Sequence, residues 1–259
     1  MEFGFWNLEF NKKMVVTERF NLDRTSALRW LDELSGTEVA FTLYLKPGTA
    51  RGEIEKMLLQ SLDSGESLDA LAEKAGGSPT GAAVFYLLGK GFVIWPPFPL
   101  DETVVCRGFE PGPLRSMLEK DWRLGLVLVR LGRYSIGVFE GSRLLAGTAG
   151  TGLVHARHRK GGSSARRFER HRDKQMEYFF TRIEGHAREV LGPHLGGIDY
   201  IIYGGTRDTL LKMWRQCAFF QTLRPKMLNR LIALREPRRA NFEDALGQAY
   251  MCAVYQVIE

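Results

Sequence analysis

The chain has 259 residues, of which 44% are hydrophobic and 25% are charged. This composition supports one large or two ordinary domains with real cores, and it excludes a largely disordered chain. No run of about 18 apolar residues occurs, which excludes an ordinary membrane helix. The first residues lack the basic-then-apolar layout of a signal peptide, so we expect a cytosolic protein.

Residues 1–120 predict an N-terminal α/β domain. Apolar residues at helical spacing and alternating apolar residues predict the following elements: helices at 23–34, 51–62 and 67–74, and strands at 39–45, 81–88, 92–95 and 103–106. The segment Gly89-Lys90-Gly91 separates two of these strands and predicts a hairpin.

Residues 121–259 predict a second domain that begins with strands and continues with helices. The pattern gives strands at 124–131, 134–139 and 144–147, a glycine-rich loop, a long helix at 164–191, a strand at 198–203, a helix at 206–217, a strand at 231–234 and a last helix at 241–257. This order is typical of a mixed sheet flanked by helices, so the fold class is α/β (α+β) with two domains.

The long helix carries one apolar stripe that needs a partner to pack against. Its members recur at steps of three and four residues: Phe168, Met176, Phe179, Ile183, Ala187 and Val190 or Leu191. The pair Gly192-Pro193 follows and ends the helix.

The cysteine and histidine residues predict neither disulfide bonds nor a metal site. Cys106, Cys217 and Cys252 are odd in number and far apart, so we expect three reduced cysteines. His155, His158 and His171 lie among many Lys and Arg side chains, which repel a divalent cation, so we expect no metal site.

Basic residues gather in one segment. The chain has 36 Lys and Arg against 30 Asp and Glu, and residues 154–174 hold eight of the basic side chains and two acidic ones. The eight are Arg157, Arg159, Lys160, Arg166, Arg167, Arg170, Arg172 and Lys174. We name residues 154–174 the basic arm. A single positive region on an otherwise neutral chain indicates a polyanionic partner, although charge runs are more often solvated helix faces.

The pair Gly161-Gly162 lies inside the basic arm, directly before the predicted long helix. Two glycines allow positive φ angles and let the backbone approach another molecule closely. The start of the helix adds free N–H groups that favour an oxyanion or a phosphate. The residues alone leave a second interpretation open, a flexible loop with Ser164 as the helix cap.

A family resemblance extends this reading. The segment HRKGGSSARRFERHRDKQ, residues 158–175, resembles the catalytic loop and following helix of the archaeal and eukaryotic peptide release factors. It is closer still to their Vms-like branch, the peptidyl-tRNA hydrolases of ribosome quality control, which has bacterial members. The matching positions are Gly161, Gly162, Ser164, Arg167, Phe168 and Arg170. The likeness is good in the second half of the chain and faint in the first, where residues 1–120 resemble release-factor domain 1.

The resemblance implies a ribonuclease-H-like second domain. It also implies hydrolysis of peptidyl-tRNA on the large ribosomal subunit, which frees nascent chains from stalled ribosomes. It implies a catalytic loop made of Gly161, Gly162, Ser163, Ser164 and Ala165. It also implies contacts to ribosomal RNA and tRNA from Arg157, His158, Arg159, Lys160, Arg166, Arg167, Arg170 and Arg172. No cofactor, metal or membrane is implied.

The sequence departs from the family at one important place. The family's glutamine follows Gly-Gly within three residues, and here those residues are Ser163, Ser164 and Ala165. Gln175 lies roughly 15 Å further along the helix and cannot replace it. The alternative function is therefore a ribosome- or tRNA-binding factor without catalysis. The codon-reading Asn-Ile-Lys-Ser motif is absent, and we expect the family's C-terminal partner-binding domain to be absent too.

A general binder of single-stranded RNA is a third interpretation. Such proteins place aromatic residues among their cations so that bases can stack. The only aromatic residue of the basic arm is Phe168, and we expect it to be buried because it belongs to the apolar stripe of the helix.

Overall fold

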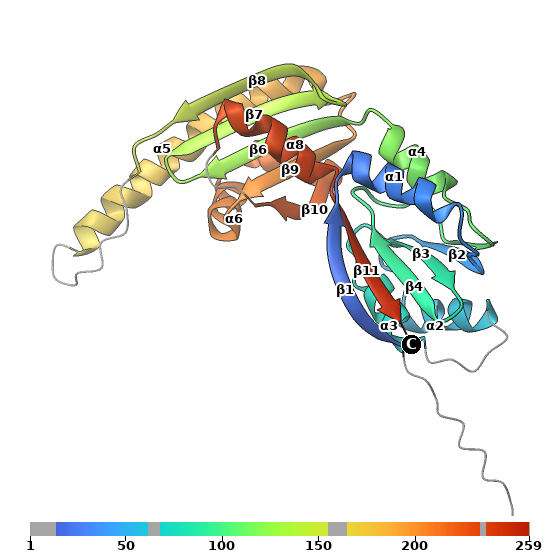
Figure 1. Ribbon diagram of the computed structural model, residues 1–259. Coiled ribbons are helices and arrows are strands. Elements are labelled where there is room, and N and C mark those ends of the chain that lie inside the picture. Colours follow the sequence, from blue (N-terminus) through green and yellow to red (C-terminus); the bar gives the residue numbers. More distant parts are fainter. Residues whose placement is uncertain (1–13, 62–67, 155–164, 234–236, 259) are drawn as a thin grey trace, which may run out of the picture. The chain divides into compact units, whose positions relative to one another are not determined.

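The structure is a computed structural model that describes residues 14–61, 68–154, 165–233 and 237–258, except for the side chains of Ala165, Arg166, Phe168 and Ala240. The chain forms two compact units. Unit 1 comprises residues 1–119 and 250–259, and unit 2 comprises residues 120–249 (Figure 1). Within the described ranges, no helix combines the length and the apolar character that crossing a membrane requires.

Unit 1 is built on a six-stranded sheet in which every neighbouring pair is antiparallel, in the order β1-β11-β4-β3-β2-β5. Its strands are β1 (Val15–Leu22), β2 (Phe41–Leu45), β3 (Ala82–Leu87), β4 (Lys90–Trp95), β5 (Val104–Arg107) and β11 (Cys252–Ile258). Residues of β2 and β3 are almost entirely buried, which fits their central place in the sheet.

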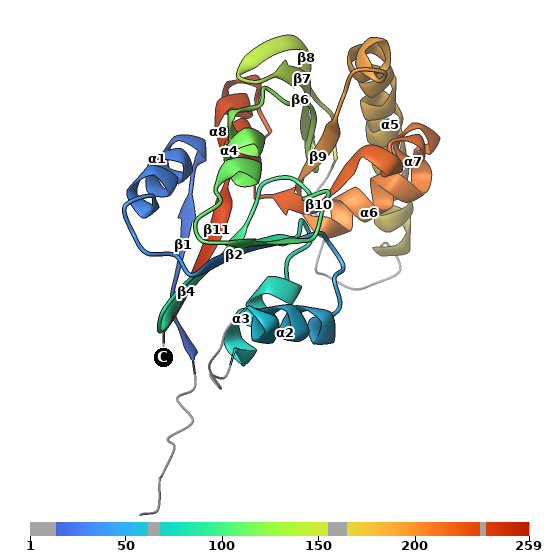
Figure 2. The ribbon, with the colours of Figure 1, turned by 90° about the vertical axis from the view of Figure 1, so that its right-hand side faces the viewer.

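Helices cover both faces of this sheet (Figure 2). Two of them, α2 (Arg51–Gln60) and α3 (Asp69–Gly76), pack with the strands into one apolar core. On the other face lie α1 (Arg24–Leu34) and α4 (Gly112–Glu119), and Trp30 of α1 meets the rings of Phe85 and Phe92 edge-on. These contacts give unit 1 two apolar layers.

Unit 2 contains a five-stranded mixed sheet in the order β10-β9-β6-β7-β8. Its strands are β6 (Arg123–Arg130), β7 (Arg133–Glu140), β8 (Arg143–Thr151), β9 (Tyr200–Gly205) and β10 (Met227–Ile232). The pairs β6·β9 and β9·β10 are parallel, whereas β7 is antiparallel to both of its neighbours. Only β7 therefore runs against the others, which is the ribonuclease-H-like arrangement that the resemblance implied. The α/β fold class with a mixed second sheet is confirmed.

The helices of unit 2 divide between the two faces of the sheet. One face carries the long α5 (Ala165–Leu191) with α6 (Arg207–Gln216) and α7 (Ala218–Thr222), and the other carries α8 (Phe242–Ala249) (Figure 2). Phe242 of α8 packs edge-on against Phe139 of β7. Three short 3-10 turns complete the unit, at Gly192–His194, Arg224–Lys226 and Arg239–Asn241.

The last segment of the chain differs from the sequence-based expectation. We expected a helix from 241 to 257 inside the second domain, but α8 ends at Ala249 and residues 252–258 form β11 of unit 1. The strand pairs with β1 on one side and β4 on the other. Cys252, Val254 and Val257 are buried there. The pairing partners lie more than 150 residues away in sequence, so local periodicity could not reveal the strand.

Other elements extend or add to the expected ones. The residues expected to form a glycine-rich loop after residue 147 continue β8 as far as Thr151. Strand β10 begins at Met227 rather than at 231, and β1, α4 and α7 were not predicted. The cysteines are free thiols, with Cys217 and Cys252 buried and Cys106 partly exposed, as expected.

Candidate nucleic-acid interface

Most of the predicted site lies outside the described residues. This holds for eight positions: Arg157, His158, Arg159, Lys160, Gly161, Gly162, Ser163 and Ser164. Ala165 is the first residue of α5, and the backbone of Arg166 belongs to its first turn. The side chains of Arg167 and Arg170 are exposed, and Arg172 is half-buried. The structure therefore describes β8, which precedes the basic arm, and α5, whose first turns belong to it.

The end of β8 packs closely against α5. A Cβ atom at Gly152 would lie 2.5 Å from Cδ2 of Phe179, and a Cβ atom at Gly150 would collide with the Tyr134 ring. Any larger residue at these two positions would hold the strand away from its neighbours. The glycines of the segment AGTAGTG thus serve close packing inside unit 2.

Polar contacts also tie α5 to the sheet. Arg182 Nη1 donates a hydrogen bond to the carbonyl oxygen of Thr151 at 3.2 Å. The phenol oxygen of Tyr134 lies 2.8 Å from Nδ1 of His186, which joins β7 to the same helix. Burial raises the pKa of the Tyr134 phenol, so its hydroxyl stays protonated at neutral pH. The end of β8 is consequently held against the packed part of α5.

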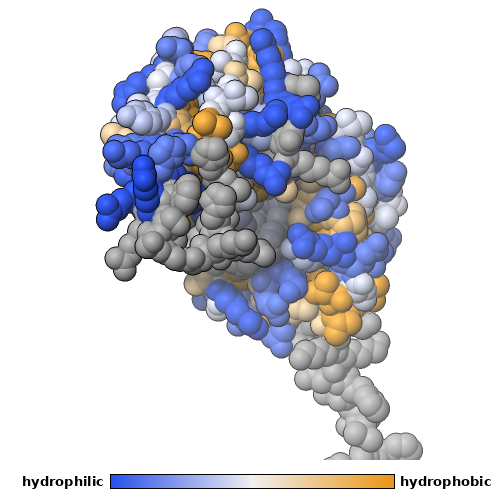
Figure 3. Space-filling view, turned by 90° about the vertical axis from the view of Figure 1, so that its left-hand side faces the viewer, coloured by the Kyte–Doolittle hydropathy of each residue, from blue (hydrophilic) through white to orange (hydrophobic). Residues whose placement is uncertain are grey.

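Helix α5 has a packed part and a projecting part. Met176, Phe179, Ile183, Ala187 and Leu191 are buried as the periodicity predicted, and Phe180 joins them in the core. Before Met176, the described side chains are exposed or half-buried. These first turns, about 15 Å long, extend beyond the sheet (Figure 1). Hydrophilic residues predominate among the coloured residues of the face shown in Figure 3.

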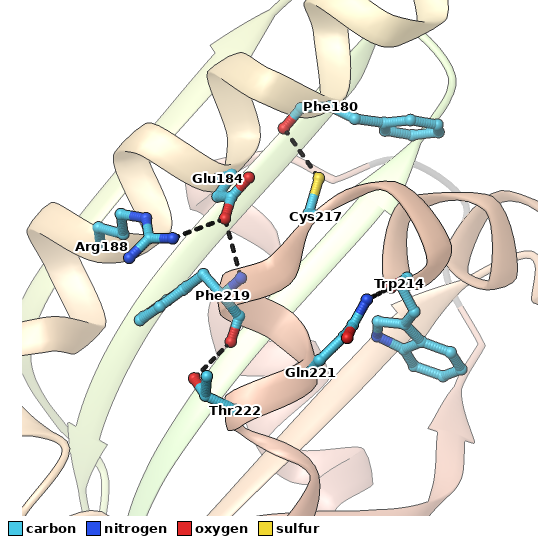
Figure 4. A network of polar contacts seen from close by, with 8 residues as sticks. All are labelled: Phe180, Glu184, Arg188, Trp214, Cys217, Phe219, Gln221 and Thr222. Atoms are coloured by element: carbon cyan, nitrogen blue, oxygen red, sulfur yellow. Dashed lines mark hydrogen bonds and ion pairs between the residues drawn. The ribbon is translucent and has the colours of Figure 1, made fainter.

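The packed part of α5 is locked to α7 by a polar network (Figure 4). Oε1 of Glu184 accepts hydrogen bonds from the backbone N–H of Phe219 and from Arg188, both at 2.8 Å. The Arg188 guanidinium also lies over the Phe219 ring, 4.8 Å from its centroid. Glu184 thus caps the start of α7 from a neighbouring helix, which fixes α5 on the side opposite to its exposed face.

The buried thiol beside this network is unreactive. Cys217 Sγ donates to the carbonyl oxygen of Phe180 at 3.5 Å. Burial raises the pKa of the Cys217 thiol to about 12, and the Glu184 carboxylate adds to the effect. A thiol held protonated in this way is a packing residue and no nucleophile. Among the residues that the structure describes, no group of three or more His, Cys, Asp and Glu side chains is placed to hold a metal ion.

Comparison with known proteins places this site in a family. A family model described as Actinobacteria/chloroflexi VLRF1 release factor matches residues 122–254, just over half of the chain. The chain belongs to this family. The match covers the whole of unit 2 that follows Asp121, and therefore includes β8, the basic arm and α5.

The chain is also similar to curated archaeal proteins named peptide chain release factor subunit 1. The protein of Pyrococcus abyssi is 36% identical over 122 residues, which are 46% of this chain and 30% of that protein. The protein of Aeropyrum pernix is 24% identical over 207 residues, which are 69% of this chain and 56% of that protein. The first of these matches thus covers less than a third of its relative's length.

Two solved structures can be compared with most of the chain. The crystal structure of the archaeal translation termination factor aRF1 has a TM-score of 0.39 at 17% identity, and the comparison covers 88% of this chain and 73% of that one. Pelota of Archaeoglobus fulgidus has a TM-score of 0.31 at 10% identity, with 93% and 63% covered.

Sequence reasoning missed two features next to the basic arm. The packing role of Gly150 and Gly152 was not foreseen, and neither was the exposed ring of Tyr178 on α5. The signal for Tyr178 was present, because residues 170, 174, 178 and 182 are spaced by four and share one helix face. The basic arm was counted only to residue 174, which left this ring outside it.

Proposed function

We propose that this protein is a ribosome-associated peptidyl-tRNA hydrolase of the Vms-like release-factor branch, which frees nascent chains from stalled ribosomes in the cytosol. The observation that carries the proposal is the position of Gly161-Gly162 in a basic segment. That segment follows β8 and continues into α5, two elements of a release-factor-family domain that contact each other through Gly152 and Arg182. A loop that starts from a fixed strand end leaves the domain at a defined place.

The reaction would be hydrolysis of the ester that joins the peptide to the tRNA 3′ end. Water attacks the ester carbonyl carbon, the bond to the ribose oxygen breaks, and a proton passes to that oxygen, which gives a free peptide and a free tRNA. Gly161 and Gly162 would let the loop backbone approach the ester, and an N–H of Gly162 or Ser163 would face the developing oxyanion. Such preorganised donors are usually the largest contribution to catalysis of this kind.

The cations of the basic arm would hold RNA around the loop. Lys and Arg neutralise phosphates and release condensed counterions, which supplies affinity without base specificity. We assign this role to Arg157, His158, Arg159, Lys160, Arg166, Arg167, Arg170 and Arg172, facing ribosomal RNA and tRNA. No cofactor is required for ester hydrolysis of this kind. Unit 1 would correspond to release-factor domain 1.

A second candidate function is supported by one observation, the absence of glutamine at positions 163, 164 and 165. The resemblance implies that this side chain orders the attacking water. A protein that keeps the fold and the basic arm without it would bind ribosomes or tRNA and leave the ester intact.

Release of a labelled peptide from stalled complexes on purified ribosomes separates the two functions. The hydrolase predicts release by the wild type, loss of release in Gly162→Ala, and nearly unchanged ribosome binding in that variant. Binding without any release by the wild type supports the second function instead.

A charge-removal series tests the RNA contacts. Replacing Arg157, Arg159 and Lys160 with Ala should weaken ribosome association and flatten its dependence on salt. The matched control removes the same charge from another helix of unit 2, with Ala at the exposed residues Arg207, Lys212 and Arg215 of α6. Equal losses in both triple variants would refute the assignment.

A further inference from the structure

One exposed face of α5 carries a continuous row of cations with an aromatic ring in it. Arg167, Arg170, Lys174, Tyr178 and Arg182 follow at steps of three or four residues, so their side chains share one side of the helix. All five are exposed. Each four-residue step advances about 6 Å along the axis. We name these five residues the α5 stripe.

Most acidic residues of α5 keep to a different face. Four of its five acidic residues, Glu169, Asp173, Glu177 and Glu184, follow at steps of four or seven and run alongside the α5 stripe, whereas Glu189 lies on the face of the stripe, two turns after Arg182. Like charges therefore stand four residues apart in both rows, as in Arg170 with Lys174. Asp173 and Glu177 stand three residues after Arg170 and Lys174, a spacing at which opposite charges can also pair. Among the described residues, neither Arg170 nor Lys174 forms an ion pair.

The ring of Tyr178 stands in the middle of the α5 stripe, one turn from Lys174 and one turn from Arg182. Its side chain is 77% exposed, although neighbouring aromatic residues of α5, Phe179 and Phe180, are buried. A lone exposed ring among cations offers a base a flat surface for stacking while the cations hold the adjoining phosphates.

We infer that the α5 stripe binds a single-stranded segment of RNA, with one base stacked on Tyr178 and adjoining phosphates held by Arg170 and Lys174. The inference rests on the proposed function for its RNA target and adds a binding site next to the loop. A single strand is favoured over a duplex because paired bases are stacked on each other and leave no face for the ring. Cations alone would serve an acidic peptide equally well, whereas an exposed ring between cations is the arrangement that stacks a base.

The test uses the full chain and a fluorescent single-stranded RNA of about 12 nucleotides, with a duplex RNA and a poly-glutamate peptide as the other probes. Tyr178→Leu should weaken binding of the single strand roughly tenfold, since stacking on one aromatic ring has about that effect. Tyr178→Phe keeps the ring and should stay within about twofold of the wild type. Because the side chain is exposed, both variants should unfold at the wild-type temperature.

The cations are tested by a double variant, Arg170→Ala with Lys174→Ala. It should reduce the salt slope of binding by about 1.4, which corresponds to two lost phosphate contacts to a single strand. The matched control, Lys212→Ala with Arg215→Ala on α6, should leave the slope unchanged. Equal binding of Tyr178→Leu and the wild type would overturn the inference, and so would tighter binding of the duplex or of poly-glutamate through the same residues.

Peptide release measured on the same variants keeps the two proposals apart. If the wild type releases no peptide but binds single-stranded RNA through Tyr178, the proposed hydrolase fails and the α5 stripe stands. If the wild type releases peptide but Tyr178→Leu binds single-stranded RNA as tightly as the wild type, the RNA site on the α5 stripe is wrong and the hydrolase proposal is supported.

Discussion

The ring of Phe179 occupies the space in which a side chain at Gly152 would lie, with only 2.5 Å between Cδ2 and the position of a Cβ atom. Phe179 belongs to α5 and Gly152 directly follows β8, so this contact fixes the end of β8 against the packed part of α5. Gly152 also donates a backbone hydrogen bond to Gly132 at 3.0 Å. Neither the ring nor the strand end can move without breaking a contact.

Gly152→Ala should therefore destabilise unit 2. The added methyl group must displace a buried ring, and overpacking of this kind costs about 1–3 kcal/mol. Urea denaturation monitored by circular dichroism measures the change in the free energy of unfolding. A free energy of unfolding equal to that of the wild type would mean that the ring or the strand end can shift freely.

Gly185→Ala is the matched substitution, with the opposite sign expected. Gly185 lies inside α5, and a Cβ atom there would meet nothing within 4 Å. Alanine loses less backbone freedom on folding than glycine, so the free energy of unfolding should rise by about 0.5–1 kcal/mol. The same denaturation experiment checks it, and a decrease would show that the helix needs glycine at this position.

Glu184→Ala should loosen α7 from α5. The substitution leaves the backbone N–H of Phe219 without its acceptor and removes the ion pair with Arg188. A lost hydrogen bond to a partly buried charged group costs about 1.5–3 kcal/mol. Glu184→Gln retains an acceptor oxygen and should recover part of the loss. Equal destabilisation by Gln and Ala would assign the effect to the charge alone.

The carboxylate of Asp23 makes a pH-dependent contribution to the stability of unit 1. Its Oδ1 accepts a hydrogen bond from the backbone N–H of Ser26 at the start of α1, which lowers the pKa of the carboxyl below its usual value. The stabilisation is therefore present above the pKa of the unfolded state and is lost as pH falls through the lower, folded-state pKa.

The corresponding measurement compares Asp23→Ala with the wild type at several pH values. Near neutral pH the substitution should cost about 1 kcal/mol, and the difference should shrink in acid. Asp23→Asn keeps a neutral acceptor and should show no such pH dependence relative to Asp23→Ala. A difference between wild type and Asp23→Ala that stays constant with pH would exclude this capping charge.

The three thiols should differ in reactivity. Cys106 is partly exposed, whereas Cys217 and Cys252 are buried and the pKa of Cys217 is raised to about 12. Iodoacetamide should modify Cys106 in the folded protein and the other two only in denaturant, because the thiolate is the reacting form. Mass spectrometry identifies the modified residues. Rapid modification of Cys217 without denaturant would contradict its burial.

The local sequence by itself determined most helices and the site candidates. The periodic residues from Met176 to Leu191 predicted which side of α5 is buried, because a stripe at steps of three and four can pack only as a helix. Charge counting found the basic arm, and Gly161-Gly162 within it, since neither depends on tertiary contacts. The family resemblance rested on the same residues.

Tertiary structure decided what depends on partners distant in sequence. The last strand, β11, is a strand because β1 and β4 flank it, and no local pattern encodes those neighbours. The end of β8 is a strand because β7 supplies its hydrogen bonds and glycines admit Phe179 and Tyr134. The sheet covers the face of α5 that the periodicity predicted to be buried, and this leaves the ring of Tyr178 on the opposite face in water.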